Sequence, residues 1–285
     1  MIQAPEPLAF EKLLSGSWAL FRRNWIVSAP FVIVVLIIGA LIGVFAVIAT
    51  VVGLTAGLRQ NHVDGGVIAL LIVFYLVLIA AALVLSVWAY AATFGMADAM
   101  WERGTATFAD GNAAFRARGG ALVVACIGII GLTFVALILA LPTLFISLLA
   151  LALFTMYVLP SVVSGRRAGF DAISESIRLV RHNFATSAIT AVVLYAISYG
   201  ISFLGVIPIF ALDFSILPTS SDATPQMPPI PLLVFALGGY LLTMIASLAY
   251  AGFCAVAITG LYRSLIARAA PVPVAPPLEI APPQV

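Results

Sequence analysis

Residues 121–163 read ALVVACIGIIGLTFVALILALPTLFISLLALALFTMYVLPSVV, a stretch that contains no Asp, Glu, Lys, Arg or His. A helix needs about 20 predominantly apolar residues to cross the hydrocarbon core of a bilayer. The stretch is therefore long enough for two crossings, and Pro142 marks the break between them because proline removes a backbone donor. The sequence predicts two membrane-spanning helices here, at about 121–141 and 144–163.

Four further apolar runs lie outward from this stretch, two on each side of it. Each is long enough for one crossing, and we expect spans at about 27–56, 67–97, 184–210 and 232–261. The predicted fold is therefore all-α, a polytopic transmembrane helical bundle of six spans. Residues 1–265 form a single transmembrane domain in this interpretation, and residues 266–285 form a Pro-rich disordered tail.

The composition excludes most other classes of protein. Hydrophobic residues make up 64% of the 285 residues and charged residues only 8%, against about 25% charged in ordinary soluble domains. Charges this scarce exclude a soluble globular domain, a disordered chain and a disulfide scaffold. The two cysteines, Cys126 and Cys254, both lie in apolar runs, and a net charge of +2 gives no indication of nucleic-acid binding.

The distribution of basic residues predicts the orientation in the membrane. With both termini in the cytoplasm, twelve of the 13 Lys and Arg residues fall on the cytoplasmic side. Only Arg59, in a short loop, falls outside. Because cytoplasmic loops carry an excess of Lys and Arg, we expect a multi-pass protein of the bacterial plasma (inner) membrane with both termini cytoplasmic.

An amphipathic cytoplasmic segment precedes each pair of predicted spans. Two of these segments carry apolar stripes at helical spacing. The first stripe is Phe10, Leu13, Leu14, Ser17, Phe21 and Trp25, and the last is Phe170, Ile173, Ile177, Val180 and Phe184. Glu175 and Arg178 fall largely off the last stripe. The middle segment is weaker, and begins with the capping-box-like pattern Thr107-x-x-Asp110.

The first and last segments also match in sequence at an offset of 159 residues, which predicts an internal repeat in one orientation. The matched pairs are Ser15 with Ser174, Ser17 with Ser176, Leu20 with Leu179, Arg22 with Arg181, and Asn24 with Asn183. Helices of this kind lie in the headgroup layer, with arginines against anionic lipid. The candidate phospholipid-headgroup residues are Arg22, Arg23, Arg166, Arg167, Arg178 and Arg181.

The sequence contains no motif for catalysis, for a cofactor or for a metal. His62 and His182, the two histidines, fall on opposite sides of the membrane, so they cannot share a site. No charged residue lies near the middle of a span, which argues against a proton-driven transporter. We therefore expect a protein that is not an enzyme, with no catalytic, cofactor-binding or metal-binding residues.

Polar side chains form stripes on the second, fifth and sixth predicted spans. They are Ser86, Tyr90, Thr93, Tyr195, Ser198, Tyr199, Ser202, Thr243, Ser247 and Tyr250. Hydroxyl groups are common where transmembrane helices pack together, so helix packing accounts for such stripes. The alternative is a hydroxyl-lined cavity that holds a lipid headgroup or a small solute.

A resemblance is carried by Val158-Leu159-Pro160-Ser161-Val162-Val163, by the segment from Phe170 to Phe184, and by Leu20-Phe21-Arg22-Arg23-Asn24-Trp25. These residues resemble the membrane domain associated with glycerophosphoryl diester phosphodiesterases and related six-span bacterial proteins. In such fusions the phosphodiesterase is a separate soluble barrel. The resemblance therefore implies the membrane part without the enzyme.

These observations leave two functional hypotheses open. The first is a non-enzymatic, lipid-associated scaffold whose partners are membrane phospholipids and an envelope enzyme or a second copy of the chain. The alternative is a transporter or flippase that moves a lipid or small solute through a cavity between spans two, five and six. A continuous cavity between those spans favours the second hypothesis, and a dry bundle favours the first.

Overall fold

The computed structural model describes residues 10–58, 65–143, 145–216 and 230–269. Every regular element within these ranges is a helix. In chain order the helices are α1 (Phe10–Arg23), the short 3-10 helix η1 (Trp25–Ser28), α2 (Ala29–Leu58), α3 (Gly65–Arg103), α4 (Phe108–Ala140), α5 (Ile146–Thr155), α6 (Val158–Val163), α7 (Gly169–His182), α8 (Phe184–Ile216) and α9 (Ile230–Ala269).

Within the described ranges, six apolar helical segments are long enough to cross a membrane, which confirms the predicted all-α, six-span bundle. They are Trp25–Leu54, Ile68–Arg103, Phe108–Ala140, Ile146–Val163, Phe184–Pro208 and Ile230–Arg268. The fourth segment consists of α5 and α6 in succession. The chain is therefore an integral membrane protein that crosses the membrane several times.

The middle surface segment differs from the expectation. It is not a separate helix, because α4 continues without a break from Phe108 into the third span. The predicted capping box is present: the Asp110 carboxylate accepts hydrogen bonds from the Thr107 backbone N–H at 2.9 Å and from its hydroxyl at 2.8 Å. The cap therefore begins a spanning helix directly.

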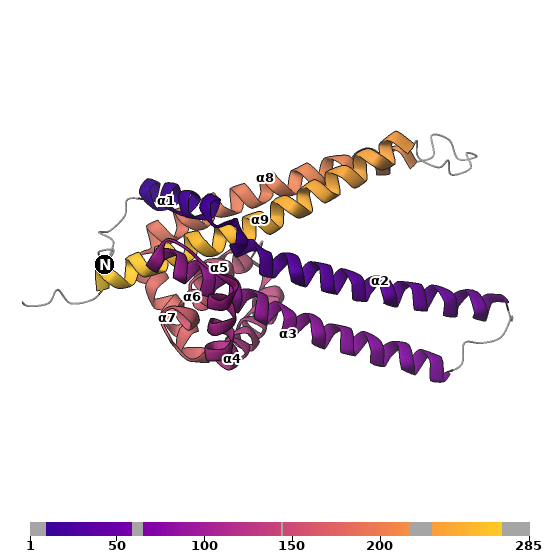
Figure 1. The fold of residues 1–285 in the computed structure, drawn as a ribbon, viewed down its shortest axis with the longest axis horizontal. Helices are drawn as coiled ribbons and strands as arrows, with labels where there is room; N and C mark the ends of the chain where they lie inside the picture. Colours follow the sequence, from indigo (N-terminus) through magenta and orange to yellow (C-terminus); the bar gives the residue numbers. More distant parts are fainter. Residues whose placement is uncertain (1–9, 59–64, 144, 217–229, 270–285) are drawn as a thin grey trace, which may run out of the picture.

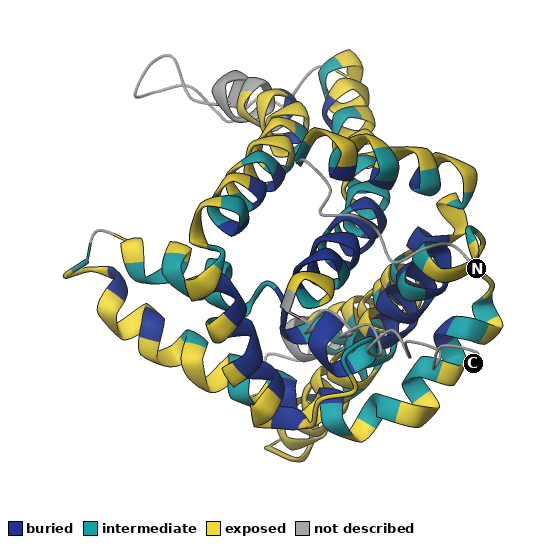
Figure 2. Ribbon diagram, turned by 90° about the vertical axis from the view of Figure 1, so that its left-hand side faces the viewer, coloured by how far each residue is buried: buried dark blue, intermediate teal, exposed yellow. Residues whose placement is uncertain are grey.

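Two long helical hairpins, α2–α3 and α8–α9, project from a helical body (Figure 1). The body contains α1 and α4 to α7, together with the ends of α3 and α9, and most buried residues gather there (Figure 2). We call the end of the molecule where α1, α7, the α3–α4 junction and the C-terminal part of α9 meet the basic end. The Lys and Arg residues predicted to be cytoplasmic lie on these segments, on the α6–α7 loop and on the N-terminal part of α4.

The projecting parts of the hairpins expose apolar side chains. Leu36, Val47 and Leu54 of α2 are each more than half exposed, as is Leu70 of α3. Exposed apolar helices suit a hydrocarbon solvent, because each spanning helix satisfies its own backbone hydrogen bonds. The exposed apolar surface of the hairpins therefore suits contact with lipid, as does that of α4, where Phe134 and Ile138 are 67% and 77% exposed.

The body is held together by close helix crossings at glycine. A Cβ atom on Gly111 of α4 would lie 2.9 Å from the Ala92 carbonyl oxygen of α3, and one on Gly95 would overlap Ala114. Small residues at such crossings let helix backbones approach closely. The crossing fixes α3 against α4 near the basic end.

The two segments of the predicted repeat have the same structure. Helices α1 and α7 both contain 14 residues, and each is followed directly by an asparagine, Asn24 and Asn183, at the 159-residue offset. Leu13, Ser17 and Phe21 are buried in α1, and the matched Ala172, Ser176 and Val180 are buried in α7. The equal lengths, matched ends and matched buried positions support an internal repeat.

The buried face of α7 agrees only in part with the stripe expected from the sequence. Ile173 and Val180 of the stripe are buried, together with the small residues Ala172 and Ser176. The two ends of the stripe are wrong, because Phe170 and Phe184 are 63% and 56% exposed. Glu175, placed off the stripe, is 8% exposed because its carboxylate accepts a hydrogen bond from the buried Ser161 hydroxyl.

We predict that Asn24→Ala destabilises the protein more than Asn183→Ala does. The Asn24 side-chain amide donates to the Leu20 carbonyl at 3.3 Å and also to the Gly104 carbonyl, across the body, at 3.0 Å. Asn183 makes only the local bond, to the Leu179 carbonyl at 3.1 Å, among the residues described. The additional bond is worth about 1 kcal/mol. Thermal unfolding of both variants in detergent measures the difference, and equal losses would contradict the account.

Some expectations concern segments outside the described residues. Arg59, His62 and residues 270–285 lie there. Helix α9 continues to Ala269, past the boundary expected at residue 265.

Candidate functional site

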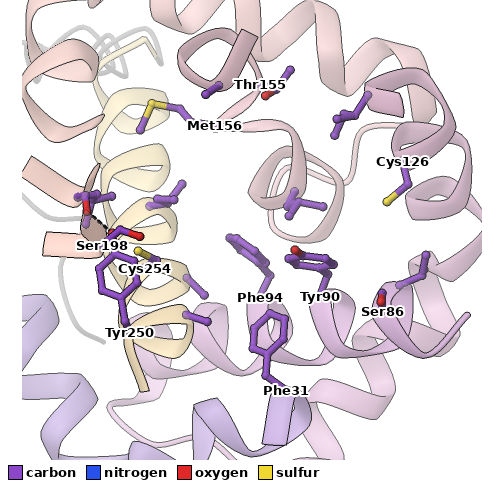
Figure 3. Close-up of a pocket in the computed structure, with 18 of the residues that line it drawn as sticks. Phe31, Ser86, Tyr90, Phe94, Cys126, Thr155, Met156, Ser198, Tyr250 and Cys254 are labelled. Atoms are coloured by element: carbon purple, nitrogen blue, oxygen red, sulfur yellow. Dashed lines mark hydrogen bonds between the residues drawn. The ribbon is translucent and has the colours of Figure 1, made fainter. Parts of the chain in front are cut away.

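A cavity of about 650 Å³ lies between the helices of the body and the adjacent parts of the hairpins (Figure 3). Its walls come from α3, α4, α5, α8 and α9, with single residues from α2 and α6. The lining residues are Phe31, Leu83, Ser86, Val87, Tyr90, Phe94, Cys126, Ile129, Ile130, Ala152, Thr155, Met156, Leu159, Ala191, Leu194, Tyr195, Ser198, Tyr250, Ala251, Cys254, Ala255 and Ile258. The lining is mostly apolar.

Five of the ten predicted cavity residues line this cavity. They are Ser86, Tyr90, Tyr195, Ser198 and Tyr250. They come from α3, α8 and α9, which are the second, fifth and sixth spans of the sequence analysis. The structure therefore brings half of the predicted set together around one space.

The other five residues lie elsewhere. The hydroxyl groups of Thr93 and Thr243 are buried with no hydrogen-bond partner in the described structure, and Thr243 packs against Gly205 between α8 and α9. Tyr199, Ser202 and Ser247 are exposed. These five residues lie at helix contacts or on the outer surface. The polar stripes therefore contain residues that pack between helices as well as residues that line the cavity.

Four hydroxyl groups of the cavity have no hydrogen-bond partner among the described residues: those of Ser86, Tyr90, Tyr195 and Ser198. Hydroxyls in spanning helices commonly bond back to the carbonyl one turn earlier, as Thr155 does to Leu151 at 2.8 Å. In a membrane there is no bulk water to satisfy a free polar group. The four groups are available to a guest that carries hydrogen-bonding atoms.

One wall of the cavity is fixed by a hydrogen bond between the helices of the second hairpin. The Tyr250 hydroxyl of α9 donates to the Leu194 carbonyl of α8. On the opposite side, the rings of Phe31 and Tyr90 meet edge to face with centroids 5.3 Å apart. These contacts join α2 to α3 and α8 to α9 beside the cavity.

The cavity is closed toward the basic end by a buried cluster. This cluster consists of Leu13, Tyr157, Leu179, Val180, Leu261, Tyr262 and Leu265. The cavity-lining residues Met156 and Ile258 pack against this cluster. The Tyr157 hydroxyl is paired with Ser187 of α8 at 2.8 Å. A guest in the cavity would thus be separated from the basic end by tightly packed side chains.

A polar cluster centred on Glu175 adjoins this buried apolar cluster at Tyr262. The Glu175 side chain is 7% exposed. Its Oε2 atom accepts a hydrogen bond from the buried Ser161 hydroxyl at 2.5 Å and one from Arg167 Nε at 3.2 Å. Arg178 lies 3.8 Å from Oε1, and the Tyr262 hydroxyl lies 3.5 Å from Oε2. The carboxylate joins α6, α7 and α9.

The loop between α6 and α7 is shaped to cover this cluster. A Cβ atom on Gly165 would overlap the Tyr262 hydroxyl and lie 2.7 Å from the Ser161 carbonyl oxygen. Arg166 then adopts a left-handed backbone with φ of 55°, and the Arg167 N–H donates to the Ser161 carbonyl at 3.1 Å. The loop thereby carries the Arg167 guanidinium to Glu175.

A second ionic cluster joins α9 to α3. The Arg263 guanidinium lies 2.7 Å from Glu102 and 3.5 Å from Asp98. Beside it, Arg103 pairs with Asp110 at 2.7 Å across the α3–α4 junction. The basic end is therefore fixed by ion pairs, whereas the projecting hairpins contain none among their described residues.

The six candidate headgroup arginines have different surroundings. Arg22, Arg23 and Arg181 are exposed and form no ion pair within the described structure. Arg166 is also exposed, in the α6–α7 loop. Arg167 and Arg178 are more than half exposed and both approach Glu175. The arginines do not form one site, and only the last two share a carboxylate.

Sequence reasoning missed the contributions of the third and fourth spans to the cavity. Cys126 of α4 and Thr155 of α5 face it (Figure 3). Each is an isolated weakly polar residue in an apolar run, so no stripe indicated it. The role of Glu175 was also missed, because helical spacing placed it off the apolar stripe of α7 and gave no indication that it is buried.

No protein-family model, no curated protein and no solved structure matches this chain.

Proposed function

We propose that this integral membrane protein binds one amphipathic molecule, a membrane lipid, in the cavity between its spanning helices. The proposal rests on the cavity of about 650 Å³ together with the four unpartnered hydroxyl groups in its wall. Ligand sites typically measure about 300–1,000 Å³ and combine an apolar lining with a few placed polar groups. The cavity has both features.

The chemistry of the lining favours a lipid over a hydrophilic solute. Leu83, Val87, Ile129 and Ile130 provide apolar surface for an acyl chain. The free hydroxyl groups provide donors and acceptors for an ester or a headgroup oxygen. No charged side chain lines the cavity, so nothing there compensates an ionic solute for the loss of its water.

The binding of a lipid between splayed hairpins is the arrangement that a transporter or flippase needs, and we infer translocation of the bound lipid as the activity. The role is non-enzymatic in this proposal. The proposed location is a bacterial inner membrane, with the basic end and both termini in the cytoplasm, supported by the gathering of Lys and Arg at one end.

A scaffold or partner of an envelope enzyme is the second proposal. It is supported by Arg22, Arg23 and Arg181, which are free to contact phospholipid headgroups, and by the exposed Trp18 and Trp25 on the same chain segment as Arg22 and Arg23. Aromatic and basic residues on a surface helix favour the headgroup layer. The resemblance to the membrane domain of glycerophosphoryl diester phosphodiesterases agrees with this proposal.

We predict that Ser198→Trp lowers lipid translocation at least tenfold, because the indole fills the space that the lipid occupies. Ser198 lines the cavity, whereas Ser202 lies one turn away on α8 and is exposed. Ser202→Trp is therefore the matched control. Purified protein is reconstituted into vesicles, and movement of a fluorescent phospholipid is followed by chemical quenching from outside.

The two variants distinguish the transport proposal from the scaffold proposal. Loss of translocation in Ser198→Trp, with activity retained in Ser202→Trp, supports transport through the cavity. Absence of translocation by the unmodified protein for anionic and zwitterionic lipids alike would overturn the transport proposal and favour the scaffold.

A further inference from the structure

A second, smaller pocket of about 260 Å³ lies at the surface of the basic end, on α7 and the α6–α7 loop. It is lined by Arg167, Asp171, Ser174, Glu175 and Arg178. Every lining side chain is polar or charged, in contrast to the cavity. The cluster of Tyr157, Tyr262 and their neighbours separates the two spaces, so this pocket is independent of the lipid cavity.

The two guanidinium groups of the pocket are held in place by a buried carboxylate. Glu175 is more than nine-tenths buried and approaches Arg167 Nε at 3.2 Å and Arg178 at 3.8 Å. Both arginine side chains are more than half exposed, at 54% and 63%. Glu175 thus accepts a hydrogen bond from Arg167 and lies within ion-pair distance of Arg178, which brings the two arginines to one carboxylate. Two neighbouring, largely exposed guanidinium groups suit phosphate oxygens.

The second acidic residue of the pocket, Asp171, is not paired as Glu175 is. Asp171 is exposed, and its carboxylate has no ion-pair or hydrogen-bond partner within the described residues. Asp171 precedes Arg178 by seven residues, two helical turns on the same face of α7. The exposed Ser174 lies between them. The pocket therefore contains a free carboxylate as well as the two arginines.

The charges of the pocket balance. Arg167 and Arg178 are opposed by Asp171 and Glu175, so a purely anionic group meets repulsion from the free carboxylate as well as attraction. A group with a phosphate and an ammonium complements both kinds of charge: the phosphate pairs with the arginines and the ammonium with Asp171. We propose that this pocket binds a phosphoethanolamine-type zwitterion, supplied by the headgroup of a zwitterionic phospholipid.

The test compares lipids that differ in the ammonium group. Full-length protein in mild detergent is mixed with equal amounts of phosphatidylethanolamine and phosphatidylglycerol, and retained lipid is counted by native mass spectrometry. We expect the unmodified protein to prefer the ethanolamine lipid. Asp171→Asn should reduce that preference about threefold to fivefold, the factor that a partly exposed ion pair supplies.

Glu11→Gln is the matched control. Glu11 lies on the other surface helix, α1, is exposed, and has no charged partner in the described structure. It should leave the preference unchanged. Arg178→Gln should weaken both lipids, because each carries a phosphate. Soluble phosphoethanolamine is added in a further arm: displacement of the lipid shows that the headgroup alone is recognised, and failure to displace shows that the acyl chains are required for binding.

An unchanged lipid preference in Asp171→Asn would overturn the proposal, as would equal retention of both lipids by the unmodified protein. A preference for the anionic lipid would show that the arginines act as an unselective anion site. The change caused by Asp171→Asn is assigned to this pocket and not to the cavity, since Asp171 and Ser198 lie in different spaces.

Discussion

Glu175→Ala is expected to lower the free energy of unfolding by about 2–3 kcal/mol. The substitution removes the acceptor of the buried Ser161 hydroxyl and the common partner of Arg167, Arg178 and Tyr262. A buried polar group left without its partner loses its interactions without regaining water. The two arginines are more than half exposed and recover much of their hydration, so most of the loss comes from Ser161 and from the space that the side chain vacates.

The loss is measured as a shift in the thermal unfolding midpoint of protein purified in one detergent. Glu175→Gln should lie between the alanine variant and the unmodified protein, because the amide keeps an oxygen acceptor for Ser161 but loses the charge. Glu11→Ala, an exposed acid on α1, should leave the midpoint unchanged. Equal midpoints for Glu175→Ala and Glu11→Ala would show that the Glu175 cluster does not hold α6, α7 and α9 together.

Gly165→Ala is expected to destabilise the protein by about 2 kcal/mol, the range for forcing extra volume into a packed site. The added methyl group overlaps the Tyr262 hydroxyl and lies 2.7 Å from the Ser161 carbonyl oxygen. The loop must then shift, and Arg167 moves with it away from Glu175.

Tyr262→Phe is expected to restore part of the stability that Gly165→Ala loses. It removes the hydroxyl that the new methyl group meets, at the cost of one long interaction with Glu175 at 3.5 Å. The double variant should therefore be more stable than the sum of the two single losses predicts, because residues in direct contact couple. The contact with Ser161 remains, so rescue is partial. Strict additivity of the two losses would contradict the packing of the loop on Tyr262.

The spanning helices could be predicted from the sequence because the bilayer imposes a simple requirement. Roughly 20 apolar residues without charge are sufficient, and residues 121–163 meet it twice. The residues at which these helices begin and end were harder to predict. Helix α4 begins at Phe108, before the apolar run, because the Thr107–Asp110 cap starts the helix at once.

The candidate site was only half predictable. Hydroxyl stripes indicated Tyr90 and Ser198, but periodicity alone does not show whether a hydroxyl faces a cavity, as Ser198 does, or the outside, as Ser202 does. That choice depends on the rotation and tilt of each helix against its neighbours. The burial of Glu175 depends likewise on a long-range contact with Ser161 and Tyr262, which helical spacing does not contain.

The repeat was visible in the sequence for a physical reason. Asn24 and Asn183 each end a surface helix by bonding back to the carbonyl four residues earlier, and the chain then turns into a span. Ser17 and Ser176 are fully buried at matched positions, and each hydroxyl donates to a backbone carbonyl, of Leu13 and of Phe154. The matched residues thus have matched structural roles in the two segments.

The central claim, that a lipid occupies the cavity, is tested most directly by photo-crosslinking. A phospholipid with a photoreactive group midway along one acyl chain is incorporated with the full-length protein, and the modified residues are mapped by mass spectrometry. We predict adducts on cavity-lining residues of different helices, Leu83, Ile130 and Ala191 among them, and their loss in Ser198→Trp but not in Ser202→Trp. Adducts confined to the outward-facing side chains of α2 and the other exposed helix surfaces, with the same pattern in both variants, would contradict the claim.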